Sequence, residues 1–308
     1  MKRNAIALMI TLLFVISISV AIGIGLKQVK DASNSVNDES FMIESSVTVD
    51  DVLKLLTTNK ELDMIVKASS LEDRRDTLAI FLAQSAFIPF ESSGIKVIVQ
   101  IKSARKKFNP NMLVDENATL HSQRIDIVSH YITTKGVESE YVDLLLDAMS
   151  GIKVDGSYRS ELFVKEPTLF RDYIADEKHL QKINDSFMQI FRTNSLKAIK
   201  FEELFYLSKE RNISIDLNQA TQEVWSMMLG AESERAELLV ENEGSYASLE
   251  DLQLTPEEKV SLAHFRTSFY EPFLDVKVEI LKGDKNVKIG FEYDLTKKKG
   301  SHFIYELQ

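Results

Sequence analysis

The sequence predicts an α+β fold in which a mostly antiparallel sheet is interrupted by a large helical insertion. Three observations support this prediction. An apolar run occupies residues 5–26, apolar and polar side chains alternate near residues 94–101 and again after residue 267, and the apolar residues between these two regions recur with helical spacing. The two strand-forming regions therefore complete one sheet around a helical insertion.

The apolar run predicts a membrane anchor. Residues 5–26 contain no charged side chain and follow Lys2 and Arg3. A helix of about 22 residues rises about 33 Å, enough to cross the hydrocarbon core of a bilayer. We expect a short cytoplasmic leader, residues 1–4, followed by a transmembrane helix, residues 5–26. The alternative is a cleaved secretory signal with Ser19–Ala21 as its cleavage site, and both alternatives export the rest of the chain.

Residues 27–107 are expected to form a long helix, a second helix and the first strands. Apolar residues with helical spacing predict one amphipathic helix, and they are Val49, Val52, Leu53, Leu56, Leu62, Ile65 and Val66. A second helix is expected from Leu71 to about Ala86, with Ser70 and Asp73 as a capping box, and Pro89 stands beyond its end. The β-branched residues at 94–101 predict a strand.

The helical insertion divides into residues 108–212 and 213–266. In the second part Gly230 stands where a helix C-cap needs a left-handed residue. Ser248 with Asp251, and Thr255 with Glu258, form two potential capping boxes. Short capped helices of this kind predict a SAM-like or helix-hairpin-helix bundle. Residues 267–308 are predicted to form three closing antiparallel strands with turns at 283–286 and 297–300.

The composition argues against catalysis. The chain has no cysteine, so thiolate chemistry and disulfides are excluded. It also lacks the sequence motifs of serine hydrolases, zinc proteases and P-loop nucleotidases. The histidines are scattered through the sequence, and they are His121, His130, His179, His264 and His302. We expect no catalytic residue, no cofactor and no small-molecule substrate.

Two further features have alternative interpretations. Asp143, Asp147 and Asp155, followed by Gly156, offer oxygen ligands for calcium but lack the tight spacing of a calcium loop. A solvated helix face and turn is the favoured interpretation, so no metal is expected. Trp225 is the only tryptophan and is expected to pack in the core rather than to form a partner hot spot.

With these features the sequence resembles the K-type minor pseudopilins of type II secretion systems. The resemblance rests on the apolar start Ala5–Leu13, on Phe108–Leu113, on Leu144–Asp147, on Ile215–Ala220 and on Ser248–Leu252. It implies a pilin-type α/β domain that continues from the transmembrane helix and surrounds the insertion. It also implies a single-pass inner-membrane protein with a periplasmic C-terminal domain, which caps or initiates the pseudopilus tip. The implied partners are other minor pseudopilins, the major pseudopilin and the inner membrane.

The N-terminus departs from the usual pilin pattern in ways that bear on processing and assembly. Asn4 stands where prepilin peptidases prefer glycine, so cleavage before Ala5 is expected to be slow or absent. Met9 stands where ordinary pilins have a glutamate, whose carboxylate is thought to neutralise the terminal amine of a neighbouring subunit. A subunit at the tip has no neighbour above it, so the absence of this glutamate favours the K type. Small residues of the same helix, Ala5, Ala7, Ala21 and Gly23, are expected with Met9 to pack against partner helices.

Two related functions stay open at this stage. A helix-hairpin-helix segment also fits membrane-anchored periplasmic receptors for DNA uptake, and the same architecture suits a type IV pilus minor pilin. Between residues 213 and 266 the sequence has 11 acidic residues against Arg235, Lys259 and Arg266, so 3 − 11 = −8. The whole chain carries −10. Because phosphate binding needs the opposite sign, no nucleic acid partner is expected.

Overall fold

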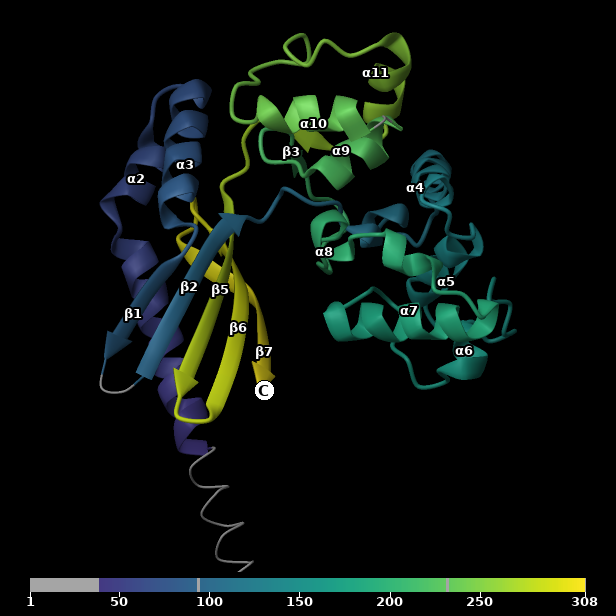
Figure 1. The fold of residues 1–308 in the computed structure, drawn as a ribbon, viewed down its shortest axis with the longest axis horizontal. Helices are drawn as coiled ribbons and strands as arrows, with labels where there is room; N and C mark the ends of the chain where they lie inside the picture. The colour runs from purple at the N-terminus through teal and green to yellow at the C-terminus, as the bar shows by residue number, and fades with distance from the viewer. Residues whose placement is uncertain (1–38, 93–94, 231–232, 308) are drawn as a thin grey trace, which may run out of the picture. The chain divides into compact units, whose positions relative to one another are not determined.

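A computed structural model describes residues 39–92, 95–230 and 233–307, which fall into two compact units, one ending at Leu55 and the other covering Leu56–Gln308. The expected transmembrane segment, residues 5–26, lies outside the described residues. Within the described residues, no helix combines the length and the apolar character that crossing a membrane requires. The prediction of an α+β fold is confirmed: the described part of the chain contains helices, a five-stranded sheet and a two-stranded sheet (Figure 1).

The first helices differ in one respect from the expected single amphipathic helix. Residues 39–58 are helical, and a separate helix, α2, covers Lys60–Lys67. Asn59 stands between them in an extended conformation, and its side-chain oxygen accepts hydrogen bonds from the N–H groups of Glu61 and Leu62 at 2.7 and 3.2 Å. The prediction of one continuous helix was wrong because an asparagine N-cap competes with helix continuation.

The next helix, α3, runs from Leu71 to Ser85 and begins at the predicted cap. The Ser70 hydroxyl accepts from the N–H of Asp73 at 3.0 Å. The buried face of α3 consists of Leu78, Phe81, Leu82 and Ser85. In Figure 1, α2 and α3 lie on one side of the sheet and the insertion lies on the other.

The main sheet has the strand order β1-β2-β5-β6-β7, and all its neighbouring strands are antiparallel. The strands are β1 (Ile88–Ser92), β2 (Ile95–Ser103), β5 (Phe273–Lys282), β6 (Lys285–Asp294) and β7 (Lys299–Leu307). The predicted strand and the three closing strands are confirmed. Strand β1 was not predicted, because Pro89 weakens the strand pattern; proline is tolerated there since β1 is an edge strand.

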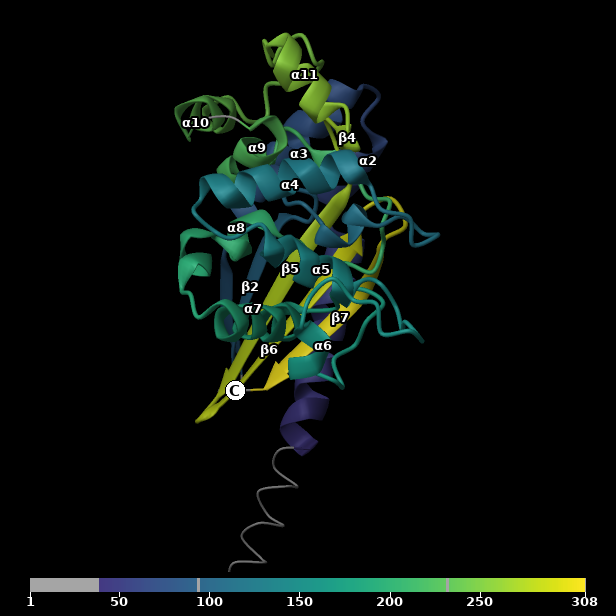
Figure 2. The same cartoon turned by 90° about the vertical axis from the view of Figure 1, so that its right-hand side faces the viewer.

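The pairing of β2 with β5 closes the sheet across the insertion, residues 104–272. Alternate residues of these strands form one buried face: Val97 faces Ile280, Val99 faces Val278, and Ile101 faces Val276. The opposite face carries polar side chains such as Lys102, Lys277 and Glu292. Figure 2, turned by 90°, shows the insertion in front of this sheet.

The insertion consists of short helices around one core. They are η1 (Pro110–Leu113), α4 (Ser122–Thr134), α5 (Glu140–Ala148), α6 (Leu162–Lys165), α7 (Glu177–Phe191), η2 (Ser195–Ala198), α8 (Phe201–Leu204), α9 (Gln222–Leu229), α10 (Ser233–Glu241) and α11 (Pro256–Leu262). A continuous cluster of buried side chains extends along the sequence from Phe108 to Phe265. Trp225 lies in this cluster and is fully buried, as predicted. Two short strands that were not predicted, β3 (Ile215–Asp216) and β4 (Thr267–Ser268), pair in parallel.

The predicted caps of the second part of the insertion had different outcomes. Gly230 ends α9 with φ +61°, and Thr255 forms a complete capping box with Glu258 at the start of α11. Ser248 and Asp251 do bond to each other, since the Asp251 carboxylate accepts from the N–H of Ser248 at 2.8 Å. They do not start a helix, however, and residues 248–253 form turns. The pair of side chains that caps a helix also stabilises an isolated turn.

Candidate functional site

The chain enters the insertion through a short segment, residues 104–108, that we call the first link. Its backbone is tied to both sides. The N–H of Ala104 donates to Phe273 at 3.0 Å in the sheet, and the N–H of Phe108 donates to Leu204 at 3.0 Å in the insertion. The carbonyl oxygens of Arg105 and Lys106 accept from the N–H groups of Asp216 and Thr221. The first link therefore has one conformation and one orientation relative to both parts.

Arg105 of the first link forms a buried ion pair with Glu292 of β6. The side chains are 2% and 5% exposed, and the two N···O distances are 2.5 and 3.0 Å, so the pair is bidentate. The guanidinium also lies over the Phe273 ring, 4.1 Å from its centre. Two charges removed from water in this way are stable only when each one is fully paired.

Tyr206 of the insertion also hydrogen-bonds to Glu292 of this ion pair. Its hydroxyl donates to Oε2 of Glu292 at 2.5 Å, and the N–H of Tyr206 bonds to the carbonyl of Phe108 at 2.9 Å. Burial, together with the charge of Glu292, raises the pKa of Tyr206 well above its usual value. The phenol therefore stays protonated and donates, so the carboxylate of one sheet residue is shared between the first link and the insertion.

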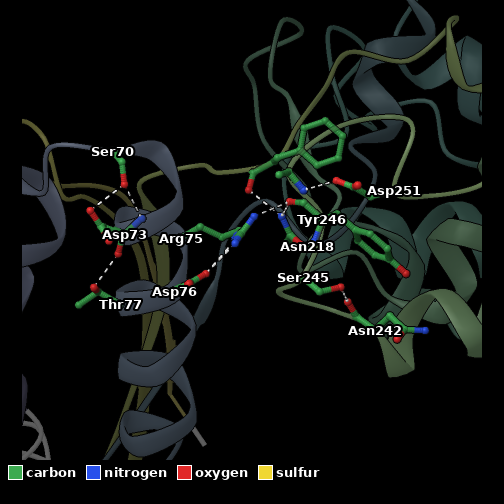
Figure 3. A network of polar contacts seen from close by, with 12 residues as sticks. Ser70, Asp73, Arg75, Asp76, Thr77, Asn218, Asn242, Ser245, Tyr246 and Asp251 are labelled. Atoms are coloured by element: carbon green, nitrogen blue, oxygen red, sulfur yellow. Dashed lines mark hydrogen bonds and ion pairs between the residues drawn. The ribbon is translucent and has the colours of Figure 1, made fainter.

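A second polar cluster connects the insertion to helix α3 (Figure 3). The Asn218 side chain accepts from the N–H of Tyr246 at 2.9 Å and donates to the carbonyl groups of Tyr246 and Phe269, each at 2.8 Å. Arg75 of α3 donates to the same carbonyl of Tyr246 at 3.0 Å. One amide side chain thus holds two distant chain segments, and the arginine joins them to the helix behind the sheet.

Asp216 lies beside Asn218 and is 2% exposed. Its carboxylate oxygens accept from the N–H groups of Asn218 and Glu271 at 3.0 and 3.1 Å. Burial raises the pKa of Asp216 to about 7, against the opposing effect of these hydrogen bonds. Asp216 belongs to Ile215–Ala220, a segment on which the resemblance rests, and the structure places it beside the first link, where the N–H of Asp216 donates to the carbonyl of Arg105 at 2.8 Å.

The residues that join the sheet, the insertion and α3, which we call the junction, could not be recognised from the sequence. Arg105, Tyr206 and Arg75 belong to no motif, and Glu292 occupies a polar position of an alternating strand, where exposure to solvent is the ordinary expectation. A basic residue that directly follows a strand was the available signal for Arg105. This signal did not identify the ion pair, because Glu292, the carboxylate partner of Arg105, lies far away in the sequence.

The three aspartates weighed as calcium ligands have other partners. The Asp147 carboxylate accepts from the N–H of Arg159 at 2.9 Å and from the N–H and hydroxyl of Ser160, each at 2.7 Å. Asp155 accepts from Ser157, and Asp143 pairs with Arg159 at 3.4 Å. In the described part of the chain, no three His, Cys, Asp or Glu side chains are grouped to hold a metal ion. Asp147 has a structural role, since it fixes the loop that precedes α6.

The predicted processing and packing residues lie outside the described residues. These are Asn4 and Ala5 for processing, and Ala5, Ala7, Met9, Ala21 and Gly23 for helix packing. They stay predictions from the sequence.

Comparison with known proteins gives a match at the level of the fold. No known family model matches the sequence, and no curated protein matches it. A solved structure does match, the crystal structure of the GspK-GspI-GspJ complex from the type 2 secretion system of enterotoxigenic Escherichia coli. The match has a TM-score of 0.57 and 11% sequence identity, and it covers 90% of this chain and 99% of the other. The chain shares its fold with GspK.

The likeness to GspK includes both the sheet and the insertion, because a match over 90% of the chain leaves no room for either to be missing. The resemblance stated from Phe108–Leu113 and Ile215–Ala220 is therefore confirmed for the fold. These two segments contain Asn109, Asn111 and Asn218, three buried asparagines whose side chains bond to distant backbone carbonyls.

The buried ion pair generates a prediction about stability. Replacing Arg105 by methionine leaves the Glu292 carboxylate buried without its cation, and we expect the free energy of unfolding to fall by about 3 to 5 kcal/mol. The double variant R105M/E292L removes both charges and should lose less stability than R105M alone. Urea denaturation followed by circular dichroism measures this. The control is D143N, which breaks an exposed pair and should change stability by about 1 kcal/mol or less. A loss in R105M as small as in D143N contradicts the assignment.

Asp216 generates a prediction about pH. Its pKa in the folded state is raised to about 7, so between pH 4 and 7 the folded protein retains a proton that the unfolded chain has lost. This group therefore contributes a stability that falls as pH rises through that window, by up to about 4 kcal/mol. The asparagine of D216N does not titrate. The free energy of unfolding of D216N, relative to that of the unsubstituted protein, should therefore increase between pH 5 and 7.5.

The matched control for this measurement is D155N. Hydrogen bonds from Ser157 lower the pKa of the exposed Asp155, so this group titrates below the window. The difference in stability between D155N and the unsubstituted protein should stay constant between pH 5 and 7.5. Parallel pH profiles for D216N and the unsubstituted protein would show that Asp216 is already charged in the folded state at pH 5.

Proposed function

We propose that the chain is a K-type minor pseudopilin of a type II secretion system, and that it acts by assembly rather than by catalysis. The observation that carries this proposal is the fold, a pilin-type sheet split between β2 and β5 by a helical insertion, matched over nearly the whole length of GspK. GspK is found in a complex with GspI and GspJ. By analogy, the partners of this chain are two other minor pseudopilins, and beyond them the major pseudopilin.

The insertion supports a position at the tip of the filament. It occupies residues 104–272 and is tied to the sheet at Glu292 and to α3 at Arg75. The contact at Glu292 is buried and the contact at Arg75 is partly buried, so separating the insertion from the sheet is costly. A bulky domain held in one place is difficult to accommodate at every step of a narrow filament. The final position of a filament imposes no such repeat.

The anchor completes the proposal. Residues 5–26 form the transmembrane helix of a single-pass inner-membrane protein whose C-terminal domain lies in the periplasm. Met9 leaves the subunit without a carboxylate for a neighbour above it, as suits a tip. Asn4 makes processing before Ala5 slow or absent. The acidic balance of residues 213–266 favours this assembly function over DNA uptake.

Coexpression tests the proposal. The full chain, produced together with two other minor pseudopilins of the same organism, should purify as one defined complex containing all three. Deletion of its gene should block export without changing the stability of the major subunit. Met9→Glu should be poorly tolerated or neutral at the tip, and function should not require this glutamate. If M9E alone makes the protein accumulate along the whole filament, the steric argument for the tip is wrong.

Fractionation tests the anchor separately. The full chain should remain in the inner-membrane fraction after carbonate extraction, because residues 5–26 are uncharged and long enough to span a bilayer. External protease should reach the C-terminal domain only after the outer membrane is opened. The matched control is a chain that begins at Lys27 behind a cleavable signal, and it should be soluble in the periplasm. Release of the full chain by carbonate contradicts the anchor.

A further inference from the structure

Four lysines gather where the polar face of the sheet meets the first link, and we call them the lysine ledge. Lys102 lies at the end of β2 that leads into the first link, and Lys277 lies on β5. Lys106 and Lys107 belong to the link itself. Lys102 stands directly opposite Asp275 in the β2–β5 pairing, and Lys277 is two residues further along β5. The hydrogen bond from the N–H of Ala104 to Phe273 at 3.0 Å holds the link beside the start of β5, and all four lysines act electrostatically on the same carboxylate, Asp275.

The ledge has more positive charge than its neighbours neutralise by contact. In the described part of the chain, Lys102, Lys106 and Lys107 form no ion pair within 4 Å, and Lys277 reaches Glu177 only at 3.9 Å between two well-exposed side chains. Asp275, Glu177 and Glu243 act on the ledge from longer range. Lys102 and Lys277 are exposed, so their ammonium groups can reach a further anion.

Burial makes this charge costly in the unbound protein. Lys106 and Lys107 are half-buried. Burial lowers the pKa of both side chains, and the neighbouring lysines lower it further, Lys102 and Lys107 acting on Lys106, and Lys277 and Lys102 acting on Lys107. An anion that settles among the ammonium groups replaces lost hydration and relieves their mutual repulsion.

The ledge rests on a rigid support. The hydrogen bonds of Ala104, Arg105, Lys106 and Phe108 fix the backbone of the first link, as described above. The charge of Arg105 is already neutralised by Glu292, so this arginine positions the link and leaves the lysines to bind. A ligand that binds to a fixed support loses less free energy to ordering than one that must organise a loop.

The spacing of the ledge selects an extended ligand. Lys102 and Lys277 are diagonal neighbours on adjacent strands, which places their Cα atoms about 7 to 8 Å apart. Alternate side chains of an extended peptide are separated by about 6.6 Å. We propose that the lysine ledge binds an extended acidic segment of a partner protein, with carboxylates at alternate positions.

The net charge of −10 does not oppose this binding at physiological salt. Charges further than about 8 Å apart are largely screened at 0.15 M ionic strength, so the local lysines decide the sign of the potential at the ledge. The proposal requires only the folded periplasmic part and goes beyond the proposed role in a pseudopilus.

A peptide-binding experiment tests the proposal. Full-length protein in a non-ionic detergent is titrated into a fluorescein-labelled peptide, Glu-Ser-Glu-Ser-Glu, and anisotropy is recorded at 0.15 M salt. The peptide should bind saturably, and its glutamine counterpart should not. K106Q/K107Q should weaken binding about tenfold or more. The matched control K165Q/K197Q removes the same charge from two exposed lysines of the insertion and should leave binding unchanged.

Several outcomes overturn the proposal. It is wrong if the acidic peptide does not bind, if K106Q/K107Q binds as tightly as the unsubstituted protein, or if K165Q/K197Q weakens binding equally. Inorganic phosphate that binds with the same affinity and displaces the peptide would show a small-anion site instead. If K106Q/K107Q loses its fold by circular dichroism, K102Q/K277Q replaces it, since both of these side chains are exposed and should tolerate the change.

Discussion

The buried contact between Arg105 and Glu292 is the constraint on which the arrangement of this chain depends. Each side chain carries a full charge into an environment with little water, so each one is stable only beside the other. Arg105 follows the last residues of β2, and Glu292 lies near the end of β6. Their pairing therefore fixes where the chain leaves the sheet, and Tyr206 extends the same contact to the insertion. A hydrophobic contact of equal area would tolerate sliding, whereas a bidentate ion pair has one geometry.

The junction contains two kinds of polar contact, a buried ion pair and hydrogen bonds from side chains to the backbone. The ion pair joins the insertion to the polar face of the sheet, and the Asn218 amide joins backbone groups of Tyr246 and Phe269 with Arg75 from the helix on the other side. Both contacts border the apolar core of the insertion, since Tyr246 belongs to that cluster and Tyr206 and Phe269 pack against it. Packing thus stabilises each part, and buried polar groups specify how the parts meet.

The sequence predicted those features that depend on nearby residues. The strand alternation of 267–308, the Ser70 cap and the Thr255 capping box follow from periodicity and local hydrogen bonds, and the structure contains them. Local rules also explain the failures. Asn59 ended a helix that apolar spacing alone would continue, and Asp251 stabilised a turn where a helix was expected. Glu292 could not be identified as buried, because its environment is created by Arg105 and Tyr206, which lie more than 80 residues away in the sequence.

The pairing of β2 with β5 has a consequence for folding. The two strands are neighbours in the sheet, yet the whole insertion is synthesised between them. Until β5 emerges, β2 has the single edge strand β1 as its partner and exposes unpaired backbone groups on its other side. An insertion that has already folded shortens the effective loop, since its ends lie together at the junction. The pairing of β2 with β5 can therefore form only after the whole insertion has been synthesised, and it depends on contacts distant in sequence.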